Sequence, residues 1–277
     1  MSTKIVGILN VAPDSFSDGK IYTRDEIQDR IQKLIDDGAD IIDIGAESTA
    51  PGRQPIPLEE ELKRLDDFFA IVGEFQWQIL FSLDTKKSEV ARIALDHGVN
   101  IINDVSGGRN DTALFPLIAS RPESNIVLMY CKNSNGHADQ EKSKNPTDIL
   151  WAVSDFFDEI LKDARIKGVR DSQIILDPGM GAFISTDAAD SVTILQSISI
   201  LKKRYHLPLL IGTSRKGFLS RLSPDKWPHD RLASSIVSSI YAMWQWANYL
   251  RVHDVYEMRQ ARQLWEILNA KEKALLA

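Results

Sequence analysis

The sequence predicts an α/β protein built as a single (β/α)8 TIM barrel. Short runs of β-branched residues recur along the whole chain, and each is followed by a stretch with helical periodicity. That alternation indicates parallel strands joined by crossover helices, and about eight such strands close a barrel. The length of 277 residues also fits, because these barrels commonly fill about 250 residues as one domain. We therefore expect one barrel domain over residues 1–277.

The predicted strands are short apolar runs that end in polar or turn-forming residues. They occupy residues 4–9, 40–44, 78–83, 99–102, 125–129, 173–176, 208–212 and 249–252. A doubly wound sheet would show the same alternation. The glycine-rich loop of a dinucleotide-binding fold does not follow the first strand, however, and the sequence contains no P-loop motif. The barrel is therefore the favoured architecture.

The predicted helices lie between these strands. They occupy residues 24–37, 58–74, 87–97, 148–167, 190–205, 229–246 and 255–275. Several are followed by a glycine, such as Gly38, Gly98 or Gly168, which can take the left-handed conformation that ends a helix. The longest irregular stretches, 46–57 and 131–145, both follow strands. Loops in that position carry the active site of a barrel enzyme.

The composition is that of an ordinary globular protein. A net charge of −6 argues against nucleic acid as a partner. The apolar stretch 232–250 is interrupted by serines, which favours a buried helix over a membrane span. Cys131 is the only cysteine, so no internal disulfide can form. With no signal-peptide pattern at the N-terminus, we expect a cytoplasmic protein with no membrane partner.

Polar residues follow or end most of the predicted strands. Each one alone is explained equally well as a turn or helix-capping residue. As a set they are informative, because a barrel gathers the carboxyl ends of its strands at one mouth. The set comprises Asn10, Asp43, Glu47, Asp84, Thr85, Asn103, Asp104, Asp177, Ser214, Arg215, Lys216, Arg251 and His253.

The chemistry of this set divides into two groups. Asp84, Asn103, Asp177 and Lys216 suit a flat heterocycle rich in donors and acceptors. A second group, from the first, seventh and eighth strands, suits a phosphate-like anion. It consists of Asn10, Ser214, Arg251 and His253. Because those strands are neighbours in a closed barrel, we expect the anion on one side of the mouth and the heterocycle at its centre.

Seven blocks of sequence carry more information together than singly. They are ILNVAPDSFSDG at 8–19, GADIIDIGAESTAPG at 38–52, SLDT at 82–85, INDVSGG at 102–108, LDPGMG at 176–181, IGTSRKGFL at 211–219 and RVHDV at 251–255. Together, and in this order, they resemble the dihydropteroate synthase family over nearly the whole chain.

That resemblance implies a transferase of folate biosynthesis, a homodimer and a target of sulfonamides. The reaction would condense 6-hydroxymethyl-7,8-dihydropterin diphosphate with 4-aminobenzoate to give 7,8-dihydropteroate and pyrophosphate. The implied displacement is dissociative and requires no covalent enzyme nucleophile. The pterin methylene–oxygen bond breaks first, pyrophosphate stays bound, and the amine then attacks the pterin cation.

The resemblance also implies a role for individual residues. The pterin would be bound by Asp84, Asn103, Met129, Asp177 and Lys216. The diphosphate would be bound by Asn10, Arg251 and His253, with Asn10 also close to Mg2+. The 4-aminobenzoate site would include Ser214, and Thr49 and Pro51 from a loop that closes over the mouth. The catalytic set would be Asp84, Asp177, Lys216, Arg251 and His253.

The chain departs from the family pattern at several positions around the second substrate. Ala12 and Ala50 replace a common Thr and Arg, and Tyr130 and Cys131 stand where a His is common after Met129. Ala182 and Phe183 exchange the usual order of bulky and small residues. We interpret these changes as a rearranged 4-aminobenzoate site with reduced sulfonamide binding.

Three other functions compete with an active synthase. The first is a pterin-binding paralogue that has lost condensation. The second is a pterin-dependent methyltransferase acting with a corrinoid protein, against which the NVAPDSFSDG opening and the RVHD ending argue. The third, a structural or interaction protein, would not need polar residues that converge at the strand ends.

Overall fold

A computed structural model of the chain describes residues 2–12, 22–74, 77–138, 148–224 and 227–276. Within these residues the parallel strands are β1 Lys4–Asn10, β2 Ile41–Gly45, β3 Leu80–Asp84, β4 Ile101–Asp104, β5 Asn125–Met129, β6 Ile174–Asp177, β7 Leu210–Ile211 and β8 Tyr249–Val252. They pair in the order β6-β5-β4-β3-β2-β1-β8-β7. A bridge between Leu176 and Leu209 joins the two ends, so the predicted barrel is confirmed.

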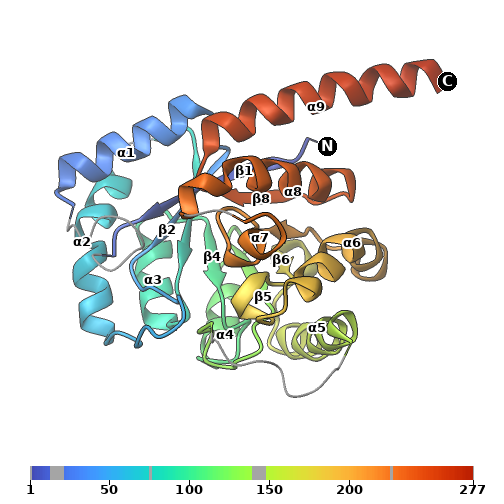
Figure 1. The fold of residues 1–277 in the computed structure, drawn as a ribbon. Helices are drawn as coiled ribbons and strands as arrows, with labels where there is room; N and C mark the ends of the chain where they lie inside the picture. Colours follow the sequence, from blue (N-terminus) through green and yellow to red (C-terminus); the bar gives the residue numbers. More distant parts are fainter. Residues whose placement is uncertain (1, 13–21, 75–76, 139–147, 225–226, 277) are drawn as a thin grey trace.

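Helices surround this barrel (Figure 1). They are α1 Arg24–Asp37, α2 Leu58–Glu74, α3 Ser88–Asp96, α4 Leu114–Ala119, α5 Ile149–Ile166, α6 Ala188–Tyr205, α7 Gly217–Leu222, α8 Leu232–Trp244 and α9 Val255–Leu276. Short 3-10 helices occur at Asp171–Gln173, Gly181–Phe183 and Pro228–Arg231. The C-terminal part of α9 extends beyond the barrel. No helix among the described residues is both long and apolar enough to span a bilayer.

Local sequence explains where the longer elements begin and end. Thr23 and Glu26 form a reciprocal capping box at the start of α1, and Gly38 ends that helix at φ 97°. Two helices were not predicted, α4 and α7, each of six residues. Both are too short to show a helical period. The strand predicted at 208–212 contracts to two residues. Pro208 has no N–H to donate to a ladder, and the N–H of Leu209 donates to Asn248 Oδ1 at 3.0 Å.

The core consists of two parts. Most apolar side chains lie in one large cluster between the strands and the helices. A smaller cluster takes one inward residue from each of six strands, and it consists of Val6, Ile41, Ile101, Val127, Ile175 and Leu210. Residues from strands that are not neighbours can meet only inside the barrel, so this second cluster plugs its interior.

Candidate active site

The alternation of side chains along each strand builds a polar layer directly above this apolar plug. Successive side chains point to opposite faces, so the residue two positions after an inward apolar residue also points inward. That rule takes Ile41 to Asp43, Ile101 to Asn103, Val127 to Met129, Ile175 to Asp177 and Tyr249 to Arg251. Register pairs Asn10 with Gly45, Gly45 with Asp84, and Asp84 with Asn103, so these strand ends lie at one level.

Arg251 contacts two carboxylates at the centre of this layer. Its Nε donates to Asp43 Oδ2 at 2.7 Å, and its Nη2 lies 3.4 Å from Asp84 Oδ2. Asn103 Nδ2 donates to the same oxygen of Asp43 at 3.3 Å. Asp43 is almost fully buried. The sequence marked it only as a polar residue within the second strand, whereas the structure shows that it fixes the guanidinium of Arg251.

Burial shifts the pKa values of the ionisable groups in this polar layer, which we call the floor of the site. It raises the pKa of Asp84 to about 8, although Arg251 beside it favours the charged form. Burial also raises the pKa of Asp177, and Lys216 and the backbone N–H of Gly179 offset part of that effect. For Lys216, burial lowers the pKa to about 8, against the opposing effect of Asp177. Asp84 and Lys216 therefore change protonation state close to neutral pH, where a ligand can shift the balance.

An apolar wall stands beside the floor. Met129 is buried and packs with Val105 and Cys131, and Phe183 packs against all three. Lys216 Nζ lies 5.1 Å from the centroid of the Phe183 ring and donates to the carbonyl of Met180 at 3.3 Å. A flat heterocycle placed on Asp177 and Lys216 would therefore meet Met129 and Phe183 at its edge or face.

Ser214 and His253 are joined on the anion side. Ser214 Oγ lies 3.1 Å from His253 Nδ1 and accepts from the backbone N–H of His253 at 3.2 Å. Desolvation and the cations Arg251 and Arg215 lower the pKa of His253 to about 4, and because the residue is exposed at the mouth, water opposes the desolvation. The imidazole is therefore neutral at pH 7 before any anion binds. The strand-end chemistry placed Ser214 in the anion group, whereas the family resemblance placed it at the second substrate. The structure joins it to His253, a residue of the predicted diphosphate site.

The loop 46–57 after β2 carries Thr49 and Pro51, both half-buried. The carbonyl of Thr49 accepts from the backbone N–H of Ala138 at 3.1 Å. Among the described residues, no hydrogen bond joins Thr49 or Pro51 to Ser214, so the three residues predicted to bind 4-aminobenzoate do not form one bonded group. The first loop, with the motif at 13–19, falls outside the described residues.

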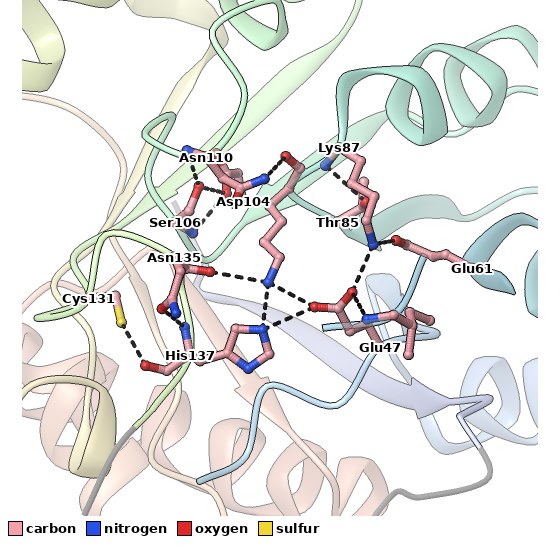
Figure 2. Close-up of polar contacts among 12 residues, drawn as sticks. Glu47, Glu61, Thr85, Lys87, Asp104, Ser106, Asn110, Cys131, Asn135 and His137 are labelled. Atoms are coloured by element: carbon pink, nitrogen blue, oxygen red, sulfur yellow. Dashed lines mark hydrogen bonds and ion pairs between the residues drawn. The ribbon is translucent and has the colours of Figure 1, made fainter. Parts of the chain in front are cut away.

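A buried cluster of ionisable groups lies beside the same loop (Figure 2). We call it the Glu47 cluster, and it consists of Glu47, Glu61, Lys86, Lys87 and His137. Glu47 pairs with Lys86 and with Lys87 at 2.8 Å each, and Lys87 also pairs with Glu61. His137 Nε2 lies 3.2 Å from Glu47 Oε1 and 2.6 Å from Lys86 Nζ.

The charges of the Glu47 cluster compensate one another. Burial alone would raise the pKa of Glu47, but hydrogen bonds with His137, Lys86 and Lys87 outweigh it and hold that pKa well below its usual range. Glu47 therefore stays ionised at neutral pH. The sequence placed Glu47 among the polar strand ends, but it gave no signal for His137, which lies in an irregular loop 51 residues from Lys86.

Comparisons with known proteins agree with this architecture. A family model described as pterin binding enzyme matches residues 6–253. The chain is 33% identical over 271 residues to dihydropteroate synthase type-3 from Escherichia coli, covering 96% of this chain and 100% of that protein. It is 36% identical over 259 residues to the folic acid synthesis protein of Pneumocystis carinii, covering 92% of this chain but 34% of that protein. This chain thus spans about a third of the fungal relative.

Solved structures show the same likeness in three dimensions. A crystal structure of dihydropteroate synthase from Clostridium difficile in the presence of pteroic acid matches with a TM-score of 0.85 and 34% identity, covering 96% of this chain and 97% of that one. The fold, the polar floor and the family model together define a pterin-binding barrel enzyme. Within that class, the chain belongs to the dihydropteroate synthase family, and the expected transferase of folate synthesis is confirmed.

Proposed function

We propose that this chain condenses 6-hydroxymethyl-7,8-dihydropterin diphosphate with 4-aminobenzoate, releasing pyrophosphate and 7,8-dihydropteroate. The observation that carries the proposal is the floor of the barrel, where buried Asp84 and Asp177 and the cation Lys216 adjoin Arg251. Carboxylates accept the paired N–H groups of an aminopyrimidinone edge. One relative was crystallised in the presence of pteroic acid, a compound in which a pterin is joined to 4-aminobenzoate.

The electrostatics of the floor favour a dissociative displacement. Asp84 and Asp177 are costly to ionise in the ligand-free protein because they are buried. A pterin ring that becomes positively charged as the methylene–oxygen bond breaks lowers that cost, so the floor binds the cation more strongly than the neutral ring. Arg251 stabilises the departing diphosphate, and Lys216 can exchange a proton with the ring because its pKa is near 8.

His253 would complete the diphosphate site only after the anion arrives. Its pKa of about 4 means that the free protein presents a neutral imidazole hydrogen-bonded to Ser214. A diphosphate beside it adds negative charge, which raises the imidazole pKa and favours a proton on the ring. The site thus gains positive charge when the leaving group is present.

Asn10 fits the role of a protein ligand to Mg2+. A methyl group at Gly45 would stand 3.3 Å from Asn10 Oδ1, so glycine there leaves that oxygen open. The described residues contain no group of three His, Cys, Asp or Glu side chains able to hold a metal ion. Mg2+ commonly uses one or two protein oxygens together with phosphate oxygens and water. When bound, it would supply charge that stabilises the leaving pyrophosphate.

The face of α8 supports a homodimer. One face of this helix is buried as expected, and small polar residues share that face with Ala242 and Met243. Ser235 Oγ accepts from Arg215 N at 2.9 Å, and Ser238 Oγ donates to Thr213 Oγ1 at 2.8 Å. Val237 is 69% exposed and Trp244 is 56% exposed. α9 adds further exposed apolar residues, namely Leu264, Ile267 and Leu268. An apolar surface of this kind is typical of an interface between subunits. Light scattering of the purified protein should give twice the chain mass.

A cytoplasmic location belongs to the same proposal. Its support is the single buried cysteine, Cys131, which suits a reducing compartment. Fractionation of cells that express the protein should recover it with cytoplasmic markers, and recovery in a secreted or periplasmic fraction would contradict this location.

The direct test of the reaction is a substrate-omission assay. The purified protein is incubated with dihydropterin diphosphate, Mg2+ and 4-aminobenzoate, and each component is left out in turn while pyrophosphate and dihydropteroate are measured. We expect dihydropteroate only when both substrates and the metal are present. Pterin binding without turnover in the complete mixture would instead identify a pterin-binding paralogue.

A further inference from the structure

The Glu47 cluster joins segments that are distant in sequence. Glu47 follows β2, Glu61 lies in the first turn of α2, Lys86 and Lys87 follow β3, and His137 lies between β5 and α5. Lys86 Nζ also donates to the carbonyl of Asn135 at 3.1 Å. The cluster contains two lysines and two glutamates, so its basic and acidic side chains are equal in number. Figure 2 shows the side chains of Lys87 and His137 approaching Glu47 from different segments of the chain.

Glu47 of this cluster connects the two ends of the loop 46–57. Glu47 stands at its start, and Glu47 Oε2 accepts from the backbone N–H of Ile56 at 3.3 Å near its end. Between them, Thr49 accepts from the N–H of Ala138, the residue after His137. Glu47 therefore holds the two ends of the loop together, and Thr49 attaches its middle to the segment that carries His137.

The barrel itself does not depend on these contacts. Its strands are held by their ladders and by the two apolar clusters, and the contacts of Glu47 and His137 join loops and the start of α2. A buried ion cluster contributes little net stability compared with apolar residues of the same shape, because its charges must lose their water. What such a cluster does supply is a fixed geometry for the segments it joins.

We propose that His137 and Lys86, acting through Glu47, are positioning residues for the 4-aminobenzoate site. They hold the loop with Thr49 and Pro51 in place in the ligand-free protein. This inference rests on the proposed function, because it assigns that loop to the second substrate. His137 Nε2 lies against both Lys86 Nζ and Glu47 Oε1, so removal of the ring weakens the hold on Glu47 while the lysines and glutamates of the cluster are retained.

The test separates the two substrates kinetically. His137→Leu should raise the KM for 4-aminobenzoate about tenfold, the factor expected when one hydrogen bond to a charged group is lost. The KM for the pterin diphosphate should stay within about twofold, because the floor is built on strands. His137→Gln keeps a nitrogen and an oxygen near the same place and should restore most of the affinity for 4-aminobenzoate.

Arg262→Met provides the matched control. Arg262 pairs with Asp40 at 2.6 Å and is largely buried, but it lies where α9 meets the N-terminal ends of the strands. Its replacement removes a partly buried ion pair remote from the loop and should change neither KM. If His137→Leu raises both KM values equally, or lowers only the melting temperature as Arg262→Met does, the cluster has a purely structural role and the proposal is wrong.

Amide hydrogen exchange tests the loop without turnover. Residues 47–56 of the ligand-free His137→Leu protein should exchange about tenfold faster than in the wild type, and the Arg262→Met protein should not differ there. Unchanged exchange in His137→Leu would overturn the proposal whatever the kinetics show. An inactive wild type would refute the proposed function and, with it, the role in substrate binding. The exchange rates would still show whether the cluster holds the loop.

Discussion

The floor and the rim of this active site are built in different ways. The floor residues Asp84, Asn103, Asp177 and Arg251 stand at or near the carboxyl ends of strands, above an apolar plug. The rim loop 46–57 is instead positioned by the Glu47 cluster, through contacts between distant segments. Under the proposed function, the floor would supply the chemistry of bond breaking, and the rim would set the position of the second substrate.

Replacing Arg251 by Met should have the largest effect. It removes the main cation facing the diphosphate, so kcat/KM should fall about a thousandfold. It also leaves the buried Asp43 without its partner, which should lower the free energy of unfolding by about 3–5 kcal/mol. Turnover and urea denaturation measure the two effects. The double variant with Asp43→Asn should recover stability but not activity, and a single variant as stable as the wild type would contradict this pairing.

Asp84→Asn should lower the activity and raise the stability of the protein. Because burial raises the pKa of Asp84 from its ordinary value of 3.8 to about 8, its contribution to stability is fully present below pH 4 and is lost as pH rises through 8. Asparagine does not titrate. The melting temperature of the variant should therefore exceed that of the wild type by a margin that grows from pH 5 to pH 8, while kcat falls about a hundredfold. A pH-independent margin would refute the raised pKa.

The His253 imidazole should titrate differently with and without the anion. In the free protein its pKa is about 4, so NMR should show a neutral ring at pH 6. Addition of pyrophosphate with Mg2+ should move the midpoint upward. His253→Gln should lower kcat/KM about tenfold, since the imidazole is one of several donors to the leaving group. If pyrophosphate binds and the midpoint stays where it was, His253 does not contact the diphosphate.

Phe183 should affect inhibitors more than substrates. Its ring stands beside Lys216 and packs on Val105, Met129 and Cys131, where it can obstruct groups larger than 4-aminobenzoate. We expect weak sulfonamide inhibition of the wild type and an inhibition constant about tenfold lower in Phe183→Gly. The KM for 4-aminobenzoate should change less. A wild-type inhibition constant typical of the family would contradict this interpretation.

Sequence reasoning predicted the floor well because its signal is local. Asp84, Asn103 and Asp177 each end an apolar run, and the period of two fixes the face on which they lie. Met129 and Arg251 follow by the same rule. The roles of these residues in binding stay predictions, but their convergence was readable from the chain.

The remaining features of the site depend on contacts between segments distant in sequence, which no local pattern indicates. His137 lies in an irregular loop, and its partners Lys86 and Glu47 belong to other connections. Asp43 was visible in the second strand, but its bond to Arg251 spans 208 residues. α8 is buried on one face as expected, but that face includes serines that bond to Thr213 and to the backbone N–H of Arg215, which the apolar pattern did not indicate.

Positional isotope exchange tests most directly whether the floor alone breaks the pterin methylene–oxygen bond. Dihydropterin diphosphate is labelled with 18O at the oxygen that joins the pterin methylene to the first phosphorus. It is incubated with the protein and Mg2+, without 4-aminobenzoate. We predict that the label moves into the non-bridging positions of the same phosphate, because the bond breaks and re-forms while pyrophosphate stays bound. Label that remains in the bridge until 4-aminobenzoate is added would show that the amine takes part in breaking the bond, and would contradict the division between floor and rim.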